Sequence, residues 1–239
     1  MNKPNHTIDL VIFDIAGTSV RDDGFVERAF LSVSQHHRLG LDAAWIKPRM
    51  GVHKLAVMRE ALEHASNPGD TSNITPEQLA AEFEQAIDHE VQSGNAPAMP
   101  GFIELFDDLR GSGVKVAFTT GFARTTAETV LKGAGIAYDM LVASDEVARG
   151  RPDPDIVLEA MRRAGVDDPS RIAVIGDTPN DLGSATNANA ALAIGVGHGT
   201  HRIVELADHP HTHLASNMNA LRDLLAQHTP IPSHEHAHG

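Results

Sequence analysis

The feature that most constrains the fold is an alternation of short apolar runs and amphipathic segments from residue 101 onward. Runs such as VKVAFT at 114–119 and RIAVIG at 171–176 are apolar enough to be buried on both faces of a sheet. Strands that alternate with helices form parallel sheets covered by helices on both sides. The pattern predicts strands at 8–13, 114–119, 139–143, 171–176 and 191–196, and helices at 101–111, 123–134, 153–164, 180–189 and about 217–227. The predicted class is therefore α/β, with a parallel sheet flanked by helices.

A second pattern, almost wholly helical, follows the first predicted strand. Apolar residues recur at helical spacing in residues 26–39 and 54–64. The sequence Thr75-Pro-Glu-Gln is typical of a capped helix start, and that helix runs to about residue 92. We expect a core domain of residues 1–19 and 98–230, an inserted helical cap of residues 20–97, a turn-rich connector at 66–75 and a disordered His-rich tail at 231–239.

Charge and composition exclude several classes of partner. The chain has 32 acidic and 19 basic residues, a net charge of −13 with neutral histidines. Such a field repels nucleic acids and anionic membranes, and no apolar run approaches the roughly 18 residues of a membrane span. Cysteine is absent, which fits a reducing compartment, and no secretory leader is recognisable. We expect a cytoplasmic protein that acts on a small molecule.

Polar side chains stand where the predicted strands end. Asp14 ends the first strand, Thr120 follows the strand at 114–119, and Asp177 with Asp181 follows the strand at 171–176. Arg151 lies between them in the segment RGRPDP. Because ligands bind beyond the carboxyl ends of parallel strands, we expect these side chains to form one site. The carboxylates suit Mg²⁺, Thr120 and Arg151 suit phosphoryl oxygens, and Asp14 could attack phosphorus.

These residues resemble the four sequence motifs of the haloacid dehalogenase superfamily. The matches are Asp14 in FDIAGT, Thr120 in FTTG, Arg151 in GRPDP, and Asp177 with Asp181 in GDTPND. The resemblance covers the whole chain and includes a helical insert in the position of a C1-type cap. It implies a Rossmann-like core, an Asp14 nucleophile that forms an aspartyl-phosphate, and hydrolysis by water.

The resemblance also implies a bound Mg²⁺ ion. Its ligands would be Asp14, the backbone carbonyl of Ala16 and Asp177, while Asp181 would bind through a water or hold the site in shape. Most phosphatases of the superfamily carry Asp at the position of Ala16, and that Asp protonates the leaving alkoxide. Ala16 cannot do so. Because the other motifs are intact, one explanation is a leaving group that needs no proton from position 16; loss of catalysis is the other.

A carbon leaving group meets that condition if an electron sink accepts the electrons of a C–P bond. A protonated Schiff base between a lysine and a carbonyl beta to phosphorus is such a sink. Lys54 opens a predicted helix just after Met50-Gly51, and a helix N-terminus lowers the pKa of a lysine. The sequence predicts that Lys54 faces the core from the cap.

The segments DIAGT and Met50-Gly51-x-x-Lys54 resemble the phosphonatases, or phosphonoacetaldehyde hydrolases, in which this lysine forms the Schiff base. The resemblance implies cleavage of a 2-oxoalkylphosphonate such as phosphonoacetaldehyde to acetaldehyde and phosphate. The residues expected to bind the substrate are Met50, Gly51, Thr120, Gly121 and Arg151.

Two positions depart from that subgroup, which carries a His three residues after the lysine and a Tyr after the second-motif glycine. This chain has Val57 and Phe122 there. Two other functions therefore stay open: a phosphatase acting on a small metabolite with a good leaving group, and a non-enzymatic module that binds phosphonate or phosphate. A homodimer through the cap is a further expectation. His209, His211 and His213 are expected to lie in a loop packed by their imidazole rings.

Overall fold

The computed structural model describes residues 8–65 and 73–233 of the chain, so most of the predicted connector and the three tail histidines lie outside it. A six-stranded parallel sheet forms its centre, in the order β3-β2-β1-β4-β5-β6. This is the order of a doubly wound Rossmann-like fold, and it confirms the predicted fold class. The strands are β1 (Leu10–Asp14), β2 (Lys115–Thr119), β3 (Leu141–Val142), β4 (Ile172–Gly176), β5 (Leu192–Val196) and β6 (His213–Ala215).

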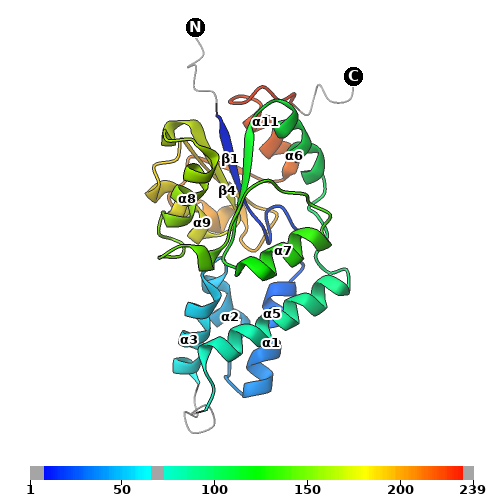
Figure 1. Ribbon diagram of the computed structural model, residues 1–239, viewed down its shortest axis with the longest axis vertical. Helices are drawn as coiled ribbons and strands as arrows, with labels where there is room; N and C mark the ends of the chain where they lie inside the picture. The colour runs from blue at the N-terminus through cyan, green and yellow to red at the C-terminus, as the bar shows by residue number, and fades with distance from the viewer. Residues whose placement is uncertain (1–7, 66–72, 234–239) are drawn as a thin grey trace.

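Helices cover both faces of the sheet (Figure 1). In β1, Leu10 and Ile12 pack into the apolar cluster beneath α8 and α9, while Val11 and Phe13 face the cluster of α6, α7 and α11. The continuous apolar run of β1 is thus explained by burial on two sides. The helices of this part are α6 (Phe102–Gly111), α7 (Arg124–Gly133), η2 (Ser144–Glu146), α8 (Asp155–Ala164), η3 (Pro169–Arg171), α9 (Pro179–Asn187), α10 (Ile203–Leu206) and α11 (Met218–Leu225).

A helical lobe lies beyond the end of the sheet at which β1 ends (Figure 1). Its elements are α1 (Phe25–His37), α2 (Ala43–Ile46), η1 (Lys47–Arg49), α3 (Lys54–His64) and α5 (Pro76–Gln92). The start of α5 has the predicted capping box, in which the Thr75 hydroxyl accepts from the Gln78 amide and the Gln78 side chain accepts from the Thr75 amide. Phe30 of α1 and Phe83 of α5 pack with their ring centroids 4.6 Å apart, which joins the two longest helices of the lobe.

The chain passes between the two parts at two points that lie side by side. Val20 and Ala98 form an antiparallel bridge. The amide of Arg21 donates to the Pro97 carbonyl at 2.9 Å, and the amide of Met99 donates to the carbonyl of residue 19 at 2.8 Å. We propose that the core and the cap, expected from the sequence to divide at residues 20 and 97, meet at this bridge.

The sequence prediction lacked β6, α2 and α10, as well as the short 3₁₀ helices η1, η2 and η3. His213 opens β6, where its ring packs edge-on against His228 with centroids 6.2 Å apart, and His209 is exposed. His209 and His211 do lie in a loop, but the prediction is wrong for His213, which belongs to a strand, and for the packing of His209. Ile231 is buried, so packing continues past residue 230. Among the described helices, none is both long and apolar enough to span a membrane.

Candidate active site

Three aspartates meet at the carboxyl edge of the sheet. Asp14 is the last residue of β1 and lies opposite Thr119 of β2. Asp177 follows β4 directly, and Asp181 lies in the first turn of α9. One carboxylate oxygen of each aspartate lies within 4.8 Å of the others, and all three side chains are buried. The structure thus brings Asp14 together with two acids that lie far from it in the sequence.

Asp177 is held by hydrogen bonds from two loops. The Thr18 hydroxyl donates to Oδ1 at 3.1 Å, and the Thr200 amide donates to Oδ2 at 2.6 Å. Both loops approach so closely that a Cβ at Gly17 or Gly199 would overlap the Asp177 carboxylate. Burial, then the charge of neighbouring carboxylates, raises the pKa of Asp177 well above its ordinary value.

Asp181 serves first as a cap of its own helix. Its Oδ2 accepts hydrogen bonds from the amide of Thr178 at 3.0 Å and from the hydroxyl of Thr178 at 2.6 Å. The Thr178 side chain in turn accepts from the Asp181 amide, which completes a capping box at the start of α9. This local pattern fixes Asp181 with its other oxygen, Oδ1, directed at Arg151, 2.6 Å from Nη1.

Arg151 is buried among these acids. Its Nη1 donates to Asp14 Oδ1 at 2.6 Å, and its Nη2 donates to the Thr119 hydroxyl at 2.6 Å. The Thr120 hydroxyl accepts from the Phe122 amide at 3.2 Å and lines the cavity in front of Asp14. A guanidinium and a hydroxyl thus stand beside the predicted nucleophile.

The arrangement fits a divalent cation. Arg151 supplies one positive charge against three buried carboxylates, and burial followed by the charge of Asp181 raises the pKa of Asp14 to about 7. Asp181 Oδ1 accepts no hydrogen bond from the described residues, despite its ion pair with Arg151. A hard cation such as Mg²⁺ prefers oxygen ligands of this kind and would offset the excess negative charge.

Lys54 enters the site from the helical lobe as the first residue of α3. Its side chain is only 7% exposed, and Nζ donates to the Val52 carbonyl at 3.0 Å. Three aromatic rings surround the amine, with Nζ 5.6 Å from the ring centroid of Phe30, 5.9 Å from that of Phe83 and 5.3 Å from that of Phe122. Burial lowers the pKa of Lys54 to about 8, because loss of solvent around the amine disfavours its charged form.

A glycine contact holds the lobe against the sheet near Lys54. A Cβ on Gly121 would overlap the carbonyl of Gly51, and Gly51 itself has a φ of +78°. The Asn180 side chain donates to the Met50 carbonyl at 2.8 Å, which ties the same loop to the start of α9. The Met-Gly sequence before Lys54 thus permits the close approach that brings the amine to the site.

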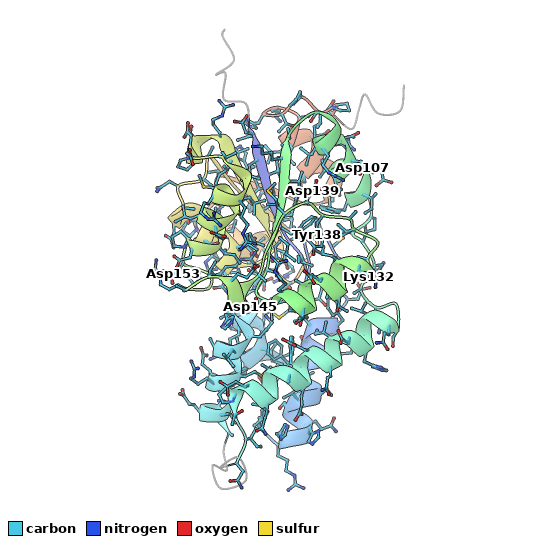
Figure 2. All side chains as sticks on the ribbon, in the orientation of Figure 1. Asp107, Lys132, Tyr138, Asp139, Asp145 and Asp153 are labelled. Atoms are coloured by element: carbon cyan, nitrogen blue, oxygen red, sulfur yellow. The ribbon has the colours of Figure 1, made fainter. Side chains whose placement is uncertain are left out.

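Asp14 and Lys54 border one small cavity of about 20 Å³, the space of about one water molecule. Its lining consists of Asp14, Ala16, Val26, Met50, Gly51, Lys54, Thr120, Gly121, Phe122, Thr178 and Thr200. Val57, one turn beyond Lys54, is fully buried in the lobe and is not part of this lining. A hollow of about 280 Å³ on the other side of Lys54 includes His53 and Asp145, and Figure 2 shows Asp145 at the junction of sheet and lobe.

Most of the residues expected from the sequence border this cavity or its acidic cluster. Asp177 and Asp181 belong to the acidic cluster and do not border the cavity, whereas Asp14 belongs to both. Arg151 contacts the cluster through Asp14. The sequence analysis missed the amide of Thr200, the Thr18 hydroxyl, the Asn180 amide and the rings of Phe30 and Phe83. A usable signal existed for Thr200, because GVGHGT follows a strand and its glycines permit close approach.

The sheet order places the switch point beside β1, where strands on either side are reached by opposite crossovers. The acidic cluster lies there. The chain is therefore a doubly wound α/β protein whose switch point carries three carboxylates suited to a metal ion. The sequence pattern of the haloacid dehalogenase-like hydrolases matches residues 8–189, which is most of the chain. The protein belongs to that family.

Among the curated proteins to which the chain is similar, one is named a probable phosphatase and others are named phosphonoacetaldehyde hydrolases. It is 31% identical over 202 residues to the probable phosphatase IndB of Dickeya dadantii, covering 82% of this chain and 84% of that protein. It is 28% identical over 193 residues to a phosphonoacetaldehyde hydrolase of Bacillus cereus, covering 76% and 73%. A solved hydrolase structure from Pseudomonas syringae superposes with a TM-score of 0.79 at 24% identity, covering 93% and 99%, which supports the fold.

Proposed function

We propose that this protein is a Mg²⁺-dependent hydrolase that cleaves the C–P bond of a 2-oxoalkylphosphonate, most simply phosphonoacetaldehyde. The observation that carries the proposal is the position of Lys54, whose side chain borders the same cavity as Asp14 and Ala16. A lysine with a lowered pKa can form an imine, and a carboxylate can accept a phosphoryl group. The similarity to phosphonoacetaldehyde hydrolase supports this assignment.

The proposed reaction begins at the Lys54 amine, which adds to the substrate aldehyde and expels water to give a protonated imine. An oxygen of Asp14 then bonds to phosphorus as the C–P bond breaks, and the electron pair of that bond moves into the imine to form an enamine. Protonation of the enamine carbon and hydrolysis of the imine release acetaldehyde and the free amine. A further water cleaves the aspartyl-phosphate, so one water is consumed overall.

The other residues bind and orient the phosphonate. Arg151 and Thr120 would contact its oxygens, with the guanidinium shared between the substrate and Asp14. A Mg²⁺ ion held by Asp14, Asp177 and the Ala16 carbonyl would supply positive charge at the phosphoryl oxygens. No proton is required from position 16, because the electron pair of the broken bond goes to the imine.

The closed cavity limits how the substrate arrives. A space of about 20 Å³ holds one water molecule but not a phosphonate, so the lobe must separate from the sheet for binding. The bridge between Val20 and Ala98 is where we place the hinge. Closure then excludes water from the imine and from the phosphorylated Asp14.

The test measures phosphate release from phosphonoacetaldehyde with and without Mg²⁺, and borohydride trapping of the protein followed by mass spectrometry. We expect release that depends on Mg²⁺ and a reduced adduct on Lys54. Lys54→Arg keeps the positive charge but cannot form the imine, and should lose both signals. Lys47→Arg changes a partly exposed lysine of the same lobe and serves as the control. Turnover without an adduct at Lys54 would exclude the imine.

A phosphatase is the second candidate, favoured by the 31% identity to a probable phosphatase. With Ala16 unable to protonate an alkoxide, such an enzyme would hydrolyse aryl phosphates far faster than sugar phosphates. A panel of phosphate esters graded by leaving-group pKa separates the two functions. A binding module would instead gain thermal stability from phosphonate or phosphate, release none, and be unaffected in vivo by Asp14→Asn.

A further inference from the structure

A second group of histidine and carboxylate side chains lies on the helical lobe, at the end of α1 and the middle of α5. His37 Nε2 lies 2.9 and 2.8 Å from the two carboxylate oxygens of Glu82, and His36 Nδ1 lies 3.8 Å from Oε2. One ligand atom from each of the three residues lies within 4.8 Å of the others. None of the three borders the cavity of Asp14 and Lys54.

An ordinary ion pair explains only part of this geometry. A His37–Glu82 hydrogen bond accounts for two residues, but the third ring is also turned toward the pair. The imidazoles of His36 and His37 stack with centroids 4.5 Å apart and planes 15° apart, although neighbouring residues of a helix normally diverge. Both belong to the last turn of α1, which the left-handed residue Arg38 ends. The helix end thus presents two imidazoles to one carboxylate.

The spacing of the ligand atoms fits a tetrahedral ion. Bonds of about 2.0–2.1 Å from zinc to nitrogen or oxygen place neighbouring ligand atoms about 3.3 Å apart. The separations of 2.8 Å from His37 and 3.8 Å from His36 to Glu82 lie on either side of that value. Rotation of the 71% exposed His36 side chain would equalise them and turn its ring out of the stack with His37, so that both imidazoles point at one ion.

We propose that His36, His37 and Glu82 bind one transition-metal ion of the zinc class, with water as a further ligand. Two imidazoles and a carboxylate suit Zn²⁺, Co²⁺ or Ni²⁺, whereas the all-carboxylate cluster at the sheet suits Mg²⁺. The ion joins α1 to α5 and therefore stiffens the lobe that carries Lys54. A hollow of about 630 Å³ between the two helices, bordered by His36, Glu82 and His89, gives the ion access from solvent.

The test is a Zn²⁺ titration by calorimetry in saturating Mg²⁺, which occupies the acidic cluster. The tail histidines His234, His236 and His238 are replaced by alanine in every protein compared, so that they add no binding. We expect one Zn²⁺ per chain, and at least a tenfold weaker affinity after His36→Ala and after Glu82→Gln. His89→Ala, in the same hollow but outside the ligand group, is the matched control and should bind as the parent does.

Thermal unfolding and Co²⁺ spectra give independent readouts. Zn²⁺ should raise the unfolding midpoint of the parent and not that of His36→Ala, whose side chain is 71% exposed and loses chiefly the ring stack with His37. Co²⁺ should give the intense visible absorption of a four-coordinate ion, lost in both ligand variants. Equal Zn²⁺ affinity in the parent and both variants overturns the proposal, as does the absence of saturable binding below ~0.1 mM Zn²⁺.

Discussion

Replacing Lys54 by methionine should stabilise the folded protein at neutral pH and abolish the proposed chemistry. The Lys54 side chain is buried against three phenylalanine rings, so its charge is poorly solvated in the folded state. Methionine keeps most of the chain length and the apolar contacts while removing the charge. The change therefore separates the stability cost of the ammonium from the packing of its stem.

The magnitude follows from the lowered pKa. Burial takes the pKa of Lys54 from 10.5 to about 8, and each pKa unit corresponds to about 1.4 kcal/mol. Below pH 8 the amine is charged in both states, and the folded protein is destabilised by about 3 kcal/mol. Between pH 8 and 10.5 the unfolded chain binds a proton that the folded chain lacks, so stability rises with pH. About 2.5 kcal/mol of the cost should disappear between pH 7 and pH 10.

The assay is urea unfolding of the wild type and Lys54→Met at pH 7 and pH 10. Loss of the hydrogen bond that the neutral amine would still donate to Val52 offsets about 1 kcal/mol, so we expect a net gain of about 2 kcal/mol at pH 7. That offset is the same at both pH values. The decrease between pH 7 and pH 10 in the stability difference between Lys54→Met and the wild type is therefore the sharper measurement. Lys132→Met, at the exposed lysine labelled in Figure 2, should show no such fall. A Lys54→Met difference that stays constant from pH 7 to pH 10 would refute the reasoning.

Three further predictions concern catalysis and the lobe contact. The rate of phosphate release from phosphonoacetaldehyde should rise with pH and level off above about pH 8, since only the neutral Lys54 amine adds to the aldehyde; a rate that falls from pH 6 to 8 would contradict this. Ala16→Asp should raise turnover of sugar phosphates by about 10²–10⁴-fold and not raise C–P cleavage, measured as phosphate release from both substrates. Gly51→Ala should destabilise by about 1–2 kcal/mol in urea unfolding, because Gly51 has a φ of +78° and its Cβ would lie 3.0 Å from the Thr178 hydroxyl. Gly135→Ala, with a φ of +71° and open space around it, should cost less.

The main elements of the fold were predictable because local signals and burial agree. The run at β1 is apolar on both sides, and the starts of α5 and α9 carry threonine capping boxes. The strand β6 carries no such signal. It spans His213–Ala215, its first two residues are only partly buried, and it exists because the carboxyl half of β5 offers a free edge. Pairing of that kind depends on tertiary structure, so a segment of three residues gives no local signal that predicts it.

The acidic part of the site was predictable for a topological reason, and the surroundings of the lysine were not. Parallel strands end at one edge, so Asp14 and Asp177 had to meet once the sheet order was known. The cage of Lys54 takes Phe30 from α1 and Phe83 from α5. Those rings also have the spacing of ordinary core residues, and their contact with an amine follows from how three helices of the lobe pack.

The two departures from the phosphonatase pattern take on a physical meaning in this cage. Phe122 presents a ring to the amine where a tyrosine would present a hydroxyl, and Val57 lies in the apolar interior of the lobe. A tyrosine hydroxyl at position 122 would bring a polar group near the ammonium, whereas the Phe122 ring contributes to the burial that lowers the pKa of Lys54. At pH 8 about half of the amine is then neutral, roughly 150-fold more than for a lysine of pKa 10.5. The same burial that destabilises the folded protein would therefore supply the free amine that the proposed imine formation requires, and both effects should vanish together if Lys54 becomes solvated.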